Sequence, residues 1–221
     1  MASAKEFMKS RAVTVTTAGR YSLASRYDPT GKRREFACRT KRMSPFQMLV
    51  SAPVTGARGE RVIAYFGEFG KLDGFITDVV DGGFLLDLAG TRAQREKLAN
   101  KLVWIEKRGN NPSVEDVREQ QRIIPEDPHT TLLFGDATIL TAFVIDVSPS
   151  GAAVSADADP ELGTRLAVGR TVGTVVRKFD EGFAVKFDRL QDPARLELAI
   201  KPTTDLRAAV SAVADTTWFI N

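Results

Sequence analysis

Two groups of polar residues in the second half of the chain have the composition and spacing of a binding site. Arg118 and Arg122 form an RxxxR pattern, and Asp146, Ser148 and Gly151 form a DxSxxG pattern that follows an apolar run. Guanidinium groups fork onto phosphate oxygens or purine edges, and a carboxylate accepts adjacent N–H donors. No residue in either group is arranged to attack or protonate a substrate. The patterns therefore predict a bound ligand rather than catalysis.

Each pattern alone has an ordinary structural explanation. Two arginines four residues apart usually lie on a solvated helix face, and an Asp/Ser/Gly segment after a strand is usually a turn. Their order and spacing within one strand-rich pattern give the stronger signal.

The composition excludes several classes of protein. The chain has 221 residues, of which 43% are hydrophobic and 27% charged, as in a folded protein with one large domain or two domains of about 100 residues. One cysteine (Cys38) and one histidine (His129) leave no disulfide framework, no Cys/His zinc site and no Cys/His nucleophile pair. The longest apolar run is far shorter than the roughly 20 residues of a membrane helix, and residues 1–11 lack a hydrophobic signal core, so we expect a cytoplasmic protein.

The net charge of +3 averages two opposite halves. Residues 1–111 hold 20 Lys and Arg against 11 Asp and Glu, whereas residues 112–221 hold 11 against 17. The split suggests two units with different surfaces. The basic half includes a dense run that could attract an anionic partner or could form a solvated hairpin: Lys32, Arg33, Arg34, Arg39, Lys41 and Arg42.

The chain repeats itself after about 100 residues. Met43-Ser44-Pro45 matches Val147-Ser148-Pro149 at an offset of 104, and Gly83-Phe84 matches Gly182-Phe183 at an offset of 99. The matches keep the same order throughout, and one length difference of five residues explains the change of offset. Two copies of one domain are the simplest explanation.

The sequence of each copy predicts short strands separated by turns. Strands 75–80 and 84–88 flank Asp81-Gly82, and strands 171–179 and 183–187 flank the equivalent turn. We expect a mostly β chain of two small antiparallel barrels, with an amphipathic helix at 91–104 capping the first. The predicted divisions are domain 1 at 7–107, a linker at 108–112, domain 2 at 113–200 and a helical tail at 201–221. Further short helices are predicted at 113–121 and 204–213.

These features resemble the PilZ family of bacterial receptors for cyclic di-GMP. In that family an N-terminal RxxxR and a DxSxxG on a six-stranded barrel form the ligand site, and Arg118, Arg122, Asp146, Ser148 and Gly151 match the pattern. The resemblance implies two tandem six-stranded antiparallel PilZ-type barrels, similar to tandem alphaproteobacterial members. In this reading the arginines bind phosphate or guanine, Asp146 accepts guanine N–H groups, Ser148 adds a hydroxyl contact and Gly151 lets the backbone approach the ligand.

Domain 1 departs from the family pattern at the same places. Alignment on Ser44-Pro45 puts Arg42 at the position of the Asp and Gln47 at the position of the Gly. Upstream, the alignment equates Arg11 with Arg122 and Phe7 with Arg118. We expect that domain 1 does not bind cyclic di-GMP in the usual way.

The position of the arginine motif, together with the resemblance, suggests how binding would act. Cyclic di-GMP would be the ligand, without a cofactor, metal or enzymatic step, and ordering of the arginine-bearing linker would reorient the domains. A protein partner, reached through domain 1 or the tail, would then regulate motility, polysaccharide or biofilm behaviour. Val117, rather than an arginine, precedes the RxxxR, which favours a single bound ligand. Two alternatives remain: a basic β-barrel nucleic-acid-binding protein, and a structural adaptor that binds no ligand.

Overall fold

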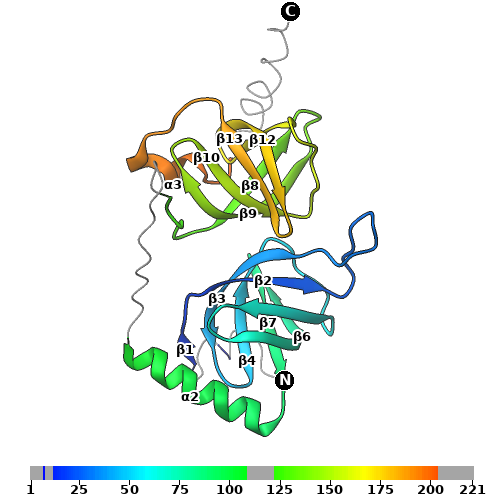
Figure 1. The fold of residues 1–221 in the computed structure, drawn as a ribbon, viewed down its shortest axis with the longest axis vertical. Coiled ribbons are helices and arrows are strands. Elements are labelled where there is room, and N and C mark those ends of the chain that lie inside the picture. Colours follow the sequence, from blue (N-terminus) through cyan, green and yellow to red (C-terminus); the bar gives the residue numbers. More distant parts are fainter. Residues whose placement is uncertain (1–6, 8–11, 109–121, 204–221) are drawn as a thin grey trace, which may run out of the picture. The chain divides into compact units, whose positions relative to one another are not determined.

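A computed structural model describes residues 7, 12–108 and 122–203 of the chain (Figure 1). The chain divides into two compact units, Met1–Glu115 and Asp116–Asn221. Arg118, the predicted helices 113–121 and 204–213, and residues 109–112 of the predicted linker lie outside the described residues. Among the described residues, no helix has the length and apolar character needed to cross a membrane.

The first unit is a closed antiparallel barrel with one additional short strand. Six strands follow the order β3-β2-β5-β6-β7-β4, and β4 pairs back onto β3 to close the barrel, while β1 extends the sheet beside β3. The strands are β1 (Val13–Thr14), β2 (Ala18–Leu23), β3 (Phe36–Met43), β4 (Gln47–Ser51), β5 (Arg61–Phe66), β6 (Gly70–Val80) and β7 (Gly83–Ala89).

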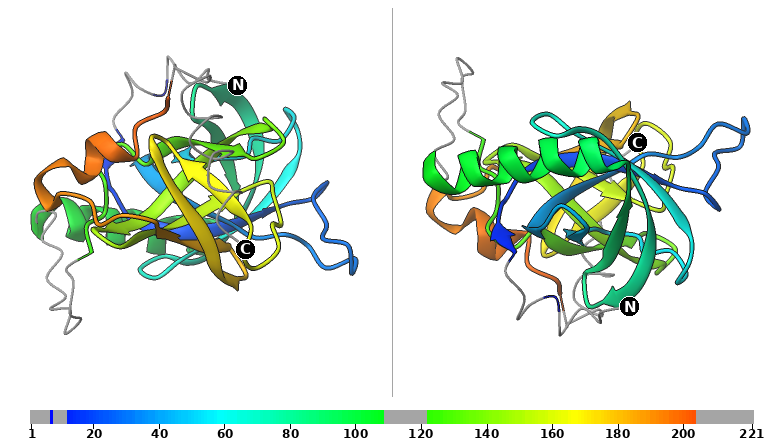
Figure 2. Two further views of the ribbon diagram at one scale, coloured as in Figure 1. Left: turned by 90° about the horizontal axis from the view of Figure 1, so that it is seen from above. Right: turned by 90° about the horizontal axis from the view of Figure 1, so that it is seen from below.

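A helix covers one end of this barrel, as the sequence predicted. Helix α2 (Arg92–Arg108) buries Leu102 and Ile105 against the core, which also holds Tyr21, Phe36 and Phe84. Seen from below, α2 lies across the first barrel (Figure 2). The helix continues four residues beyond the predicted end at Trp104.

The second unit is a closed six-stranded barrel of the same topology. Its order is β10-β13-β12-β11-β8-β9, which matches the first barrel strand for strand. The strands are β8 (His129–Phe134), β9 (Ile139–Ser148), β10 (Gly151–Ala156), β11 (Arg165–Val168), β12 (Thr171–Phe179) and β13 (Gly182–Phe187), followed by the 3-10 turn η1 (Pro193–Arg195) and the short helix α3 (Leu196–Ala199). The fold class read from the sequence, two tandem six-stranded antiparallel barrels, is confirmed.

A C-terminal segment that the sequence did not reveal closes part of the second barrel. Leu196 and Ile200 are buried in its core, and the Thr130 hydroxyl donates to the Ile200 carbonyl over 2.5 Å. Gly169 has a φ of +57°, and a Cβ there would lie 2.5 Å from the Ile200 carbonyl oxygen. The turn before β12 therefore requires glycine for two reasons.

The internal repeat is preserved in detail. Each barrel interrupts the pairing of its second and third main strands with a one-residue β-bulge, at Lys41 between β3 and β4 and at Ile145 between β9 and β10. Turn glycines agree as well, with φ of +84° at Gly59 and +85° at Gly163. Equivalent bulges and turns indicate that the barrels are two copies of one fold.

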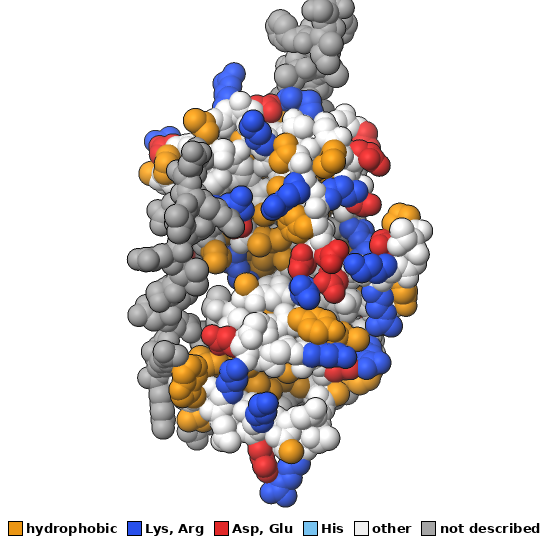
Figure 3. Space-filling model, in the orientation of Figure 1, with side chains coloured by type: hydrophobic (Ala, Val, Ile, Leu, Met, Phe, Trp, Pro, Cys, Tyr) orange, Lys and Arg blue, Asp and Glu red, His pale blue; other side chains and the backbone are white. Residues whose placement is uncertain are grey.

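The basic run of the first half does not form one surface. Arg39 belongs to β3 and is only 6% exposed, and burial lowers the pKa of its guanidinium. Lys32 and Arg34 lie in the loop between β2 and β3 instead. On the face in Figure 3, basic and acidic side chains are interspersed on each unit. The even alternation of buried and exposed residues in a strand fails in β3, where five consecutive residues are buried.

Candidate ligand site

The second barrel turns Asp146 outward through the bulge in β9. Ala142 and Val144 face the core, so strict alternation along the strand would point Asp146 inward as well. The extra residue, Ile145, shifts the register so that Asp146 pairs with Ala153 and Val147 returns to the core. The bulge thus presents a carboxylate on the outer face of the barrel.

A short antiparallel bridge places Arg122 beside this carboxylate. Ile123 and Val147 exchange two backbone hydrogen bonds, of 2.8 Å and 2.9 Å. This bridge brings the Arg122 Nη1 atom to 2.9 Å from Asp146 Oδ1 and 3.1 Å from Oδ2. The side chains are 36% and 26% exposed, so the ion pair remains open to solvent. Two residues that are 24 positions apart and belong to the two sequence patterns therefore meet.

The pair has unused hydrogen-bonding capacity. Arg122 contacts Asp146 through Nη1 alone, and within the described residues its Nη2 and Nε atoms have no hydrogen-bond partner. A guanidinium carries five donors, and a carboxylate has about four acceptor positions. The pair can therefore receive an anion or a purine edge at the arginine and N–H donors at the aspartate.

Ser148 and Gly151 shape the turn between β9 and β10. The buried Ser148 hydroxyl lies 3.3 Å from both the Gly151 carbonyl and the Ser150 hydroxyl. A Cβ on Gly151 would lie 2.5 Å from the Val185 carbonyl oxygen in β13. Close packing of β10 on β13 therefore already requires glycine at this position, and the approach of a ligand to Gly151 stays a prediction.

Small residues form the outer face beside the Arg122–Asp146 pair. Ala153 follows Asp146 in register across β10, and Ala184 follows Ala153 on β13, while Phe183 and Val185 point to the core. Figure 1 shows β10 lying between β9 and β13. We call Ala153 and Ala184 the alanine floor.

Lys186 lies beside the candidate site, and the sequence motifs did not identify it. It pairs with Gly151 in the row next to the alanine floor, and its side chain is exposed. The internal repeat could have pointed to Lys186. The offset of 99 aligns it with Asp87, so the two barrels carry opposite charges at this position. Since β13 is distant in sequence from both motifs, only the strand pairing brings it to the site.

Other residues with potential chemistry are structural. Cys38 is 1% exposed in the core of the first barrel, and burial raises the pKa of its thiol. No group of three or more His, Cys, Asp and Glu residues within the described ranges could hold a metal ion.

The equivalent surface of the first barrel is built differently. Val13 pairs with Met43 as Ile123 pairs with Val147, so Ala12, and not Arg11 as the sequence alignment had it, corresponds to Arg122. The two-residue strand β1 has no motif that could have set this register. Arg42 takes the position of Asp146 and donates from Nη2 to the Ala12 carbonyl over 3.1 Å.

The first barrel also has larger side chains at the positions that correspond to Gly151 and to the alanine floor. Gln47 takes the position of Gly151, and its Nε2 atom donates to Asp87 over 2.6 Å. Leu49 and Leu85 replace the alanine floor and are buried in a cluster with Phe7. The first barrel therefore covers this surface with its own side chains.

No curated protein sequence matches the chain. Among solved structures, it is similar to Borreliella burgdorferi PlzA in complex with c-di-GMP (10% identity over 85% of this chain and 86% of that one, TM-score 0.28). It is similar to the Bacillus subtilis inhibitor of motility MotI/DgrA (12%, 93% and 99%, TM-score 0.27) and to Escherichia coli YcgR in complex with c-di-GMP (11%, 83% and 80%, TM-score 0.25).

One protein-family model matches the second unit, which holds the Arg122–Asp146 pair. The model of the PilZ domain matches residues 116–199, from the first residue of the second unit to the end of α3. The match spans Arg122, Asp146 and the strands β9, β10 and β13. Residues 116–199 are therefore a PilZ domain.

Proposed function

We propose that the chain is a receptor that binds cyclic di-GMP on the outer face of its second barrel. The observation that carries this proposal is the solvent-open Arg122–Asp146 pair, with two guanidinium nitrogens unused among the described residues. The ligand has two phosphodiesters and two guanines. Arg122 forks onto a phosphate or onto guanine O6 and N7, and Asp146 accepts the N–H donors of a guanine Watson–Crick edge.

The neighbouring residues complete this binding surface. The alanine floor leaves space for a flat base over β10 and β13, and Lys186 adds a cation in the adjacent row. Ser148 and Gly151 support the turn from beneath. Arg118, the other arginine of RxxxR, supplies a second guanidinium for the ligand. Val117 precedes it and provides no third guanidinium, so we propose that a single ligand binds.

Binding is proposed to change how the two domains, 7–107 and 113–200, are oriented. Both arginines lie just after the boundary between the two units, so closing them over an anion would fix the path of the chain where it enters the second unit. The chain then acts without catalysis, through a protein partner that controls motility, polysaccharide or biofilm behaviour. Small-angle scattering of free and ligand-saturated protein tests this step, since identical curves would contradict it.

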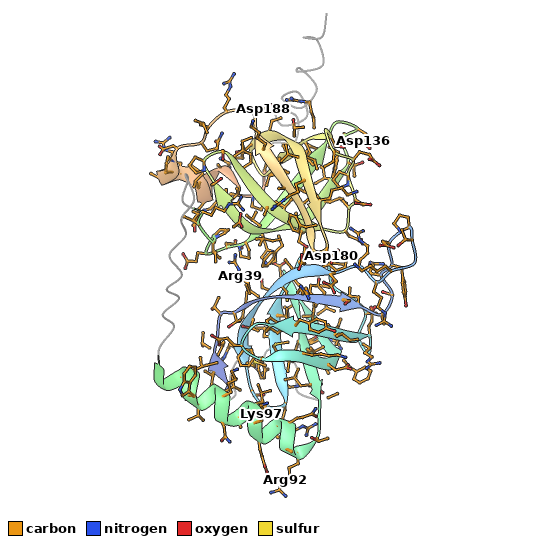
Figure 4. All side chains as sticks on the ribbon, viewed as in Figure 1. Arg39, Arg92, Lys97, Asp136, Asp180 and Asp188 are labelled. Carbon is orange, nitrogen blue, oxygen red and sulfur yellow. The ribbon has the colours of Figure 1, made fainter. Side chains whose placement is uncertain are left out.

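Isothermal titration of cyclic di-GMP into the full chain tests the site. Arg122→Ala is expected to weaken binding by about 100-fold, because two charge-assisted hydrogen bonds together contribute about 3 kcal/mol and about 1.4 kcal/mol corresponds to tenfold. Arg165→Ala is the matched control, since it breaks a similarly exposed ion pair, with Asp188, on the same barrel. Figure 4 labels Asp188. Unchanged affinity in Arg122→Ala would overturn the site assignment.

A further inference from the structure

The first unit contains a pocket that the proposed cyclic di-GMP site does not use. It has a volume of about 620 Å³ and lies between the first half of α2 and the start of β6. Gln94, Lys97, Leu98 and Lys101 form one wall, and recur at the three- and four-residue spacing of a single helix face. Residues 68–73 form the facing wall. The pocket therefore runs along about two turns of the helix, or roughly 10 Å.

An unpaired strand edge faces this pocket. Strand β6 pairs with β5 from Gly70 onward, but its pairing with β7 begins only at Asp73. On the β7 side, residues 70–72 thus have no strand partner within the described part of the chain, and the same residues line the pocket. An open edge of this kind can accept an added strand through backbone hydrogen bonds.

The charges around the pocket are mainly positive. Lys71, Arg95, Lys97 and Lys101 line it, against Glu68 and Asp73. The Asp73 carboxylate is already bound by Arg61, which holds the pKa of that carboxyl below its usual value. Lys71 also helps to lower the pKa of the Asp73 carboxyl, but neither Lys71 nor Lys97 forms an ion pair with any residue that the structure describes. The Arg95 Nε atom is buried and lacks a hydrogen-bond partner in the same ranges.

Apolar and aromatic surface lies beneath these cations. Phe69, Leu72 and Leu98 are partly buried against the barrel core and line the pocket. The Arg95 guanidinium lies 4.8 Å from the centre of the Phe46 ring, and the Lys101 ammonium lies 5.8 Å from that of Phe69. Cations held over rings leave their outer sides open to an anion.

We infer that this pocket binds an extended acidic peptide segment of a partner protein. The segment adds as a strand along residues 70–72, its Asp or Glu side chains meet Lys71 and Lys97, and an apolar side chain enters between Phe69 and Leu98. Backbone pairing supplies affinity, and the cations select acidic sequences. The inference does not require cyclic di-GMP, because every residue in it belongs to the first unit.

Peptide display on the full chain tests the inference. A phage library of random peptides of about 12 residues is selected against the wild type and against the double variant Lys71→Glu/Lys97→Glu. We expect the wild type to enrich Asp- and Glu-rich sequences with one apolar residue, and the variant to lose this enrichment. The absence of any sequence enriched on the wild type over the variant would overturn the proposal.

A matched control separates a specific site from general attraction of anions. Arg58→Glu/Arg92→Glu makes the same change of charge at two exposed arginines of the first unit that do not line the pocket. Figure 4 shows Arg92 extending from the start of α2, with Lys97 further along the helix. Fluorescence anisotropy with the best selected peptide is expected to show at least a tenfold loss for the pocket variant and less than a twofold loss for the control.

Hydrogen exchange then tests strand addition. The Lys71 amide faces the open side of β6, because residues 70 and 72 alternate with it and bond toward β5. This amide is expected to exchange at least tenfold more slowly with the peptide bound, and Arg122→Ala is expected to leave peptide affinity unchanged. Equal losses in the pocket variant and the control variant, or an unprotected Lys71 amide, would contradict the proposal. Either failure would leave cyclic di-GMP binding at the second barrel untouched, so the two proposals fail separately.

Discussion

The two barrels share a framework and differ in what they place on one outer face. Both have the same strand order and equivalent bulges, at Lys41 and Ile145. The bulge turns the next side chain outward in each, but that side chain is Arg42 in the first barrel and Asp146 in the second. The fold therefore provides the position, and a single residue decides the sign of the charge presented there.

The remaining differences reinforce this contrast. In the first barrel Arg42 is bound to the Ala12 carbonyl, Gln47 is bound to Asp87, and Phe7 covers two leucines. In the second, an open ion pair stands beside small side chains. A surface whose polar groups are satisfied within the chain and whose apolar residues are already packed has little to offer a ligand. We therefore predict that only the second barrel binds cyclic di-GMP.

The largest effect is predicted for replacing Asp146 of the second barrel by arginine, the residue that the first barrel has at the equivalent position. Asp146→Arg is expected to abolish cyclic di-GMP binding in calorimetry, because it removes the acceptor for guanine and places a second guanidinium beside Arg122. Arg42→Asp is the reciprocal control and is expected to leave both affinity and stoichiometry unchanged. A second binding event in Arg42→Asp would show that the first barrel retains a latent site.

A somewhat smaller effect is predicted for filling the alanine floor. Ala184→Leu introduces the residue that the first barrel has at the equivalent position, Leu85, and is expected to weaken binding by about 30-fold because it occupies the surface on which a base would lie. Val176→Leu adds apolar volume at an exposed position on β12, outside the floor. Equal affinity in the two variants would show that the ligand does not lie over β13.

The sequence predicted the elements well because their signals are local. The Asp81-Gly82 hairpin, the helix that begins near Thr91 and the two copies of the strand pattern were read from turn residues and periodicity, and the structure confirms them. Asp146 could be named from its motif. The bulge that turns it outward could not, since a one-residue register shift leaves no mark in composition.

What the sequence missed depends on contacts between distant segments. Lys186 reaches the site through strand pairing, and Leu196 closes the second barrel from a short helix that has no strong periodicity. Arg39 looked like part of a basic surface but is buried, within a run of five consecutive buried residues at 36–40 in β3. Local sequence patterns predict helices and strands well, but they predict poorly which of these elements lie next to each other in the fold.

A moderate effect is predicted for Lys186. Lys186→Gln is expected to weaken cyclic di-GMP binding by about fivefold and to reduce its dependence on salt, because an exposed cation near a phosphate contributes about 1 kcal/mol. Lys178→Gln is the control, on the neighbouring strand β12, where the lysine is paired with Asp159. Equal salt dependence in both variants would remove Lys186 from the site.

The smallest difference is predicted for the serine that the barrels share. Ser44 lies 3.3 Å from the Gln47 carbonyl, as Ser148 lies 3.3 Å from the Gly151 carbonyl, so the hydroxyl supports the same turn with or without a ligand site. Ser44→Ala and Ser148→Ala are each expected to lower the unfolding free energy by about 1 kcal/mol, measured by hydrogen exchange of the adjoining hairpin. Cyclic di-GMP affinity should change less than threefold in either variant. A tenfold loss in Ser148→Ala alone would instead show that its hydroxyl contacts the ligand, and that the second barrel has turned a structural residue to a second use.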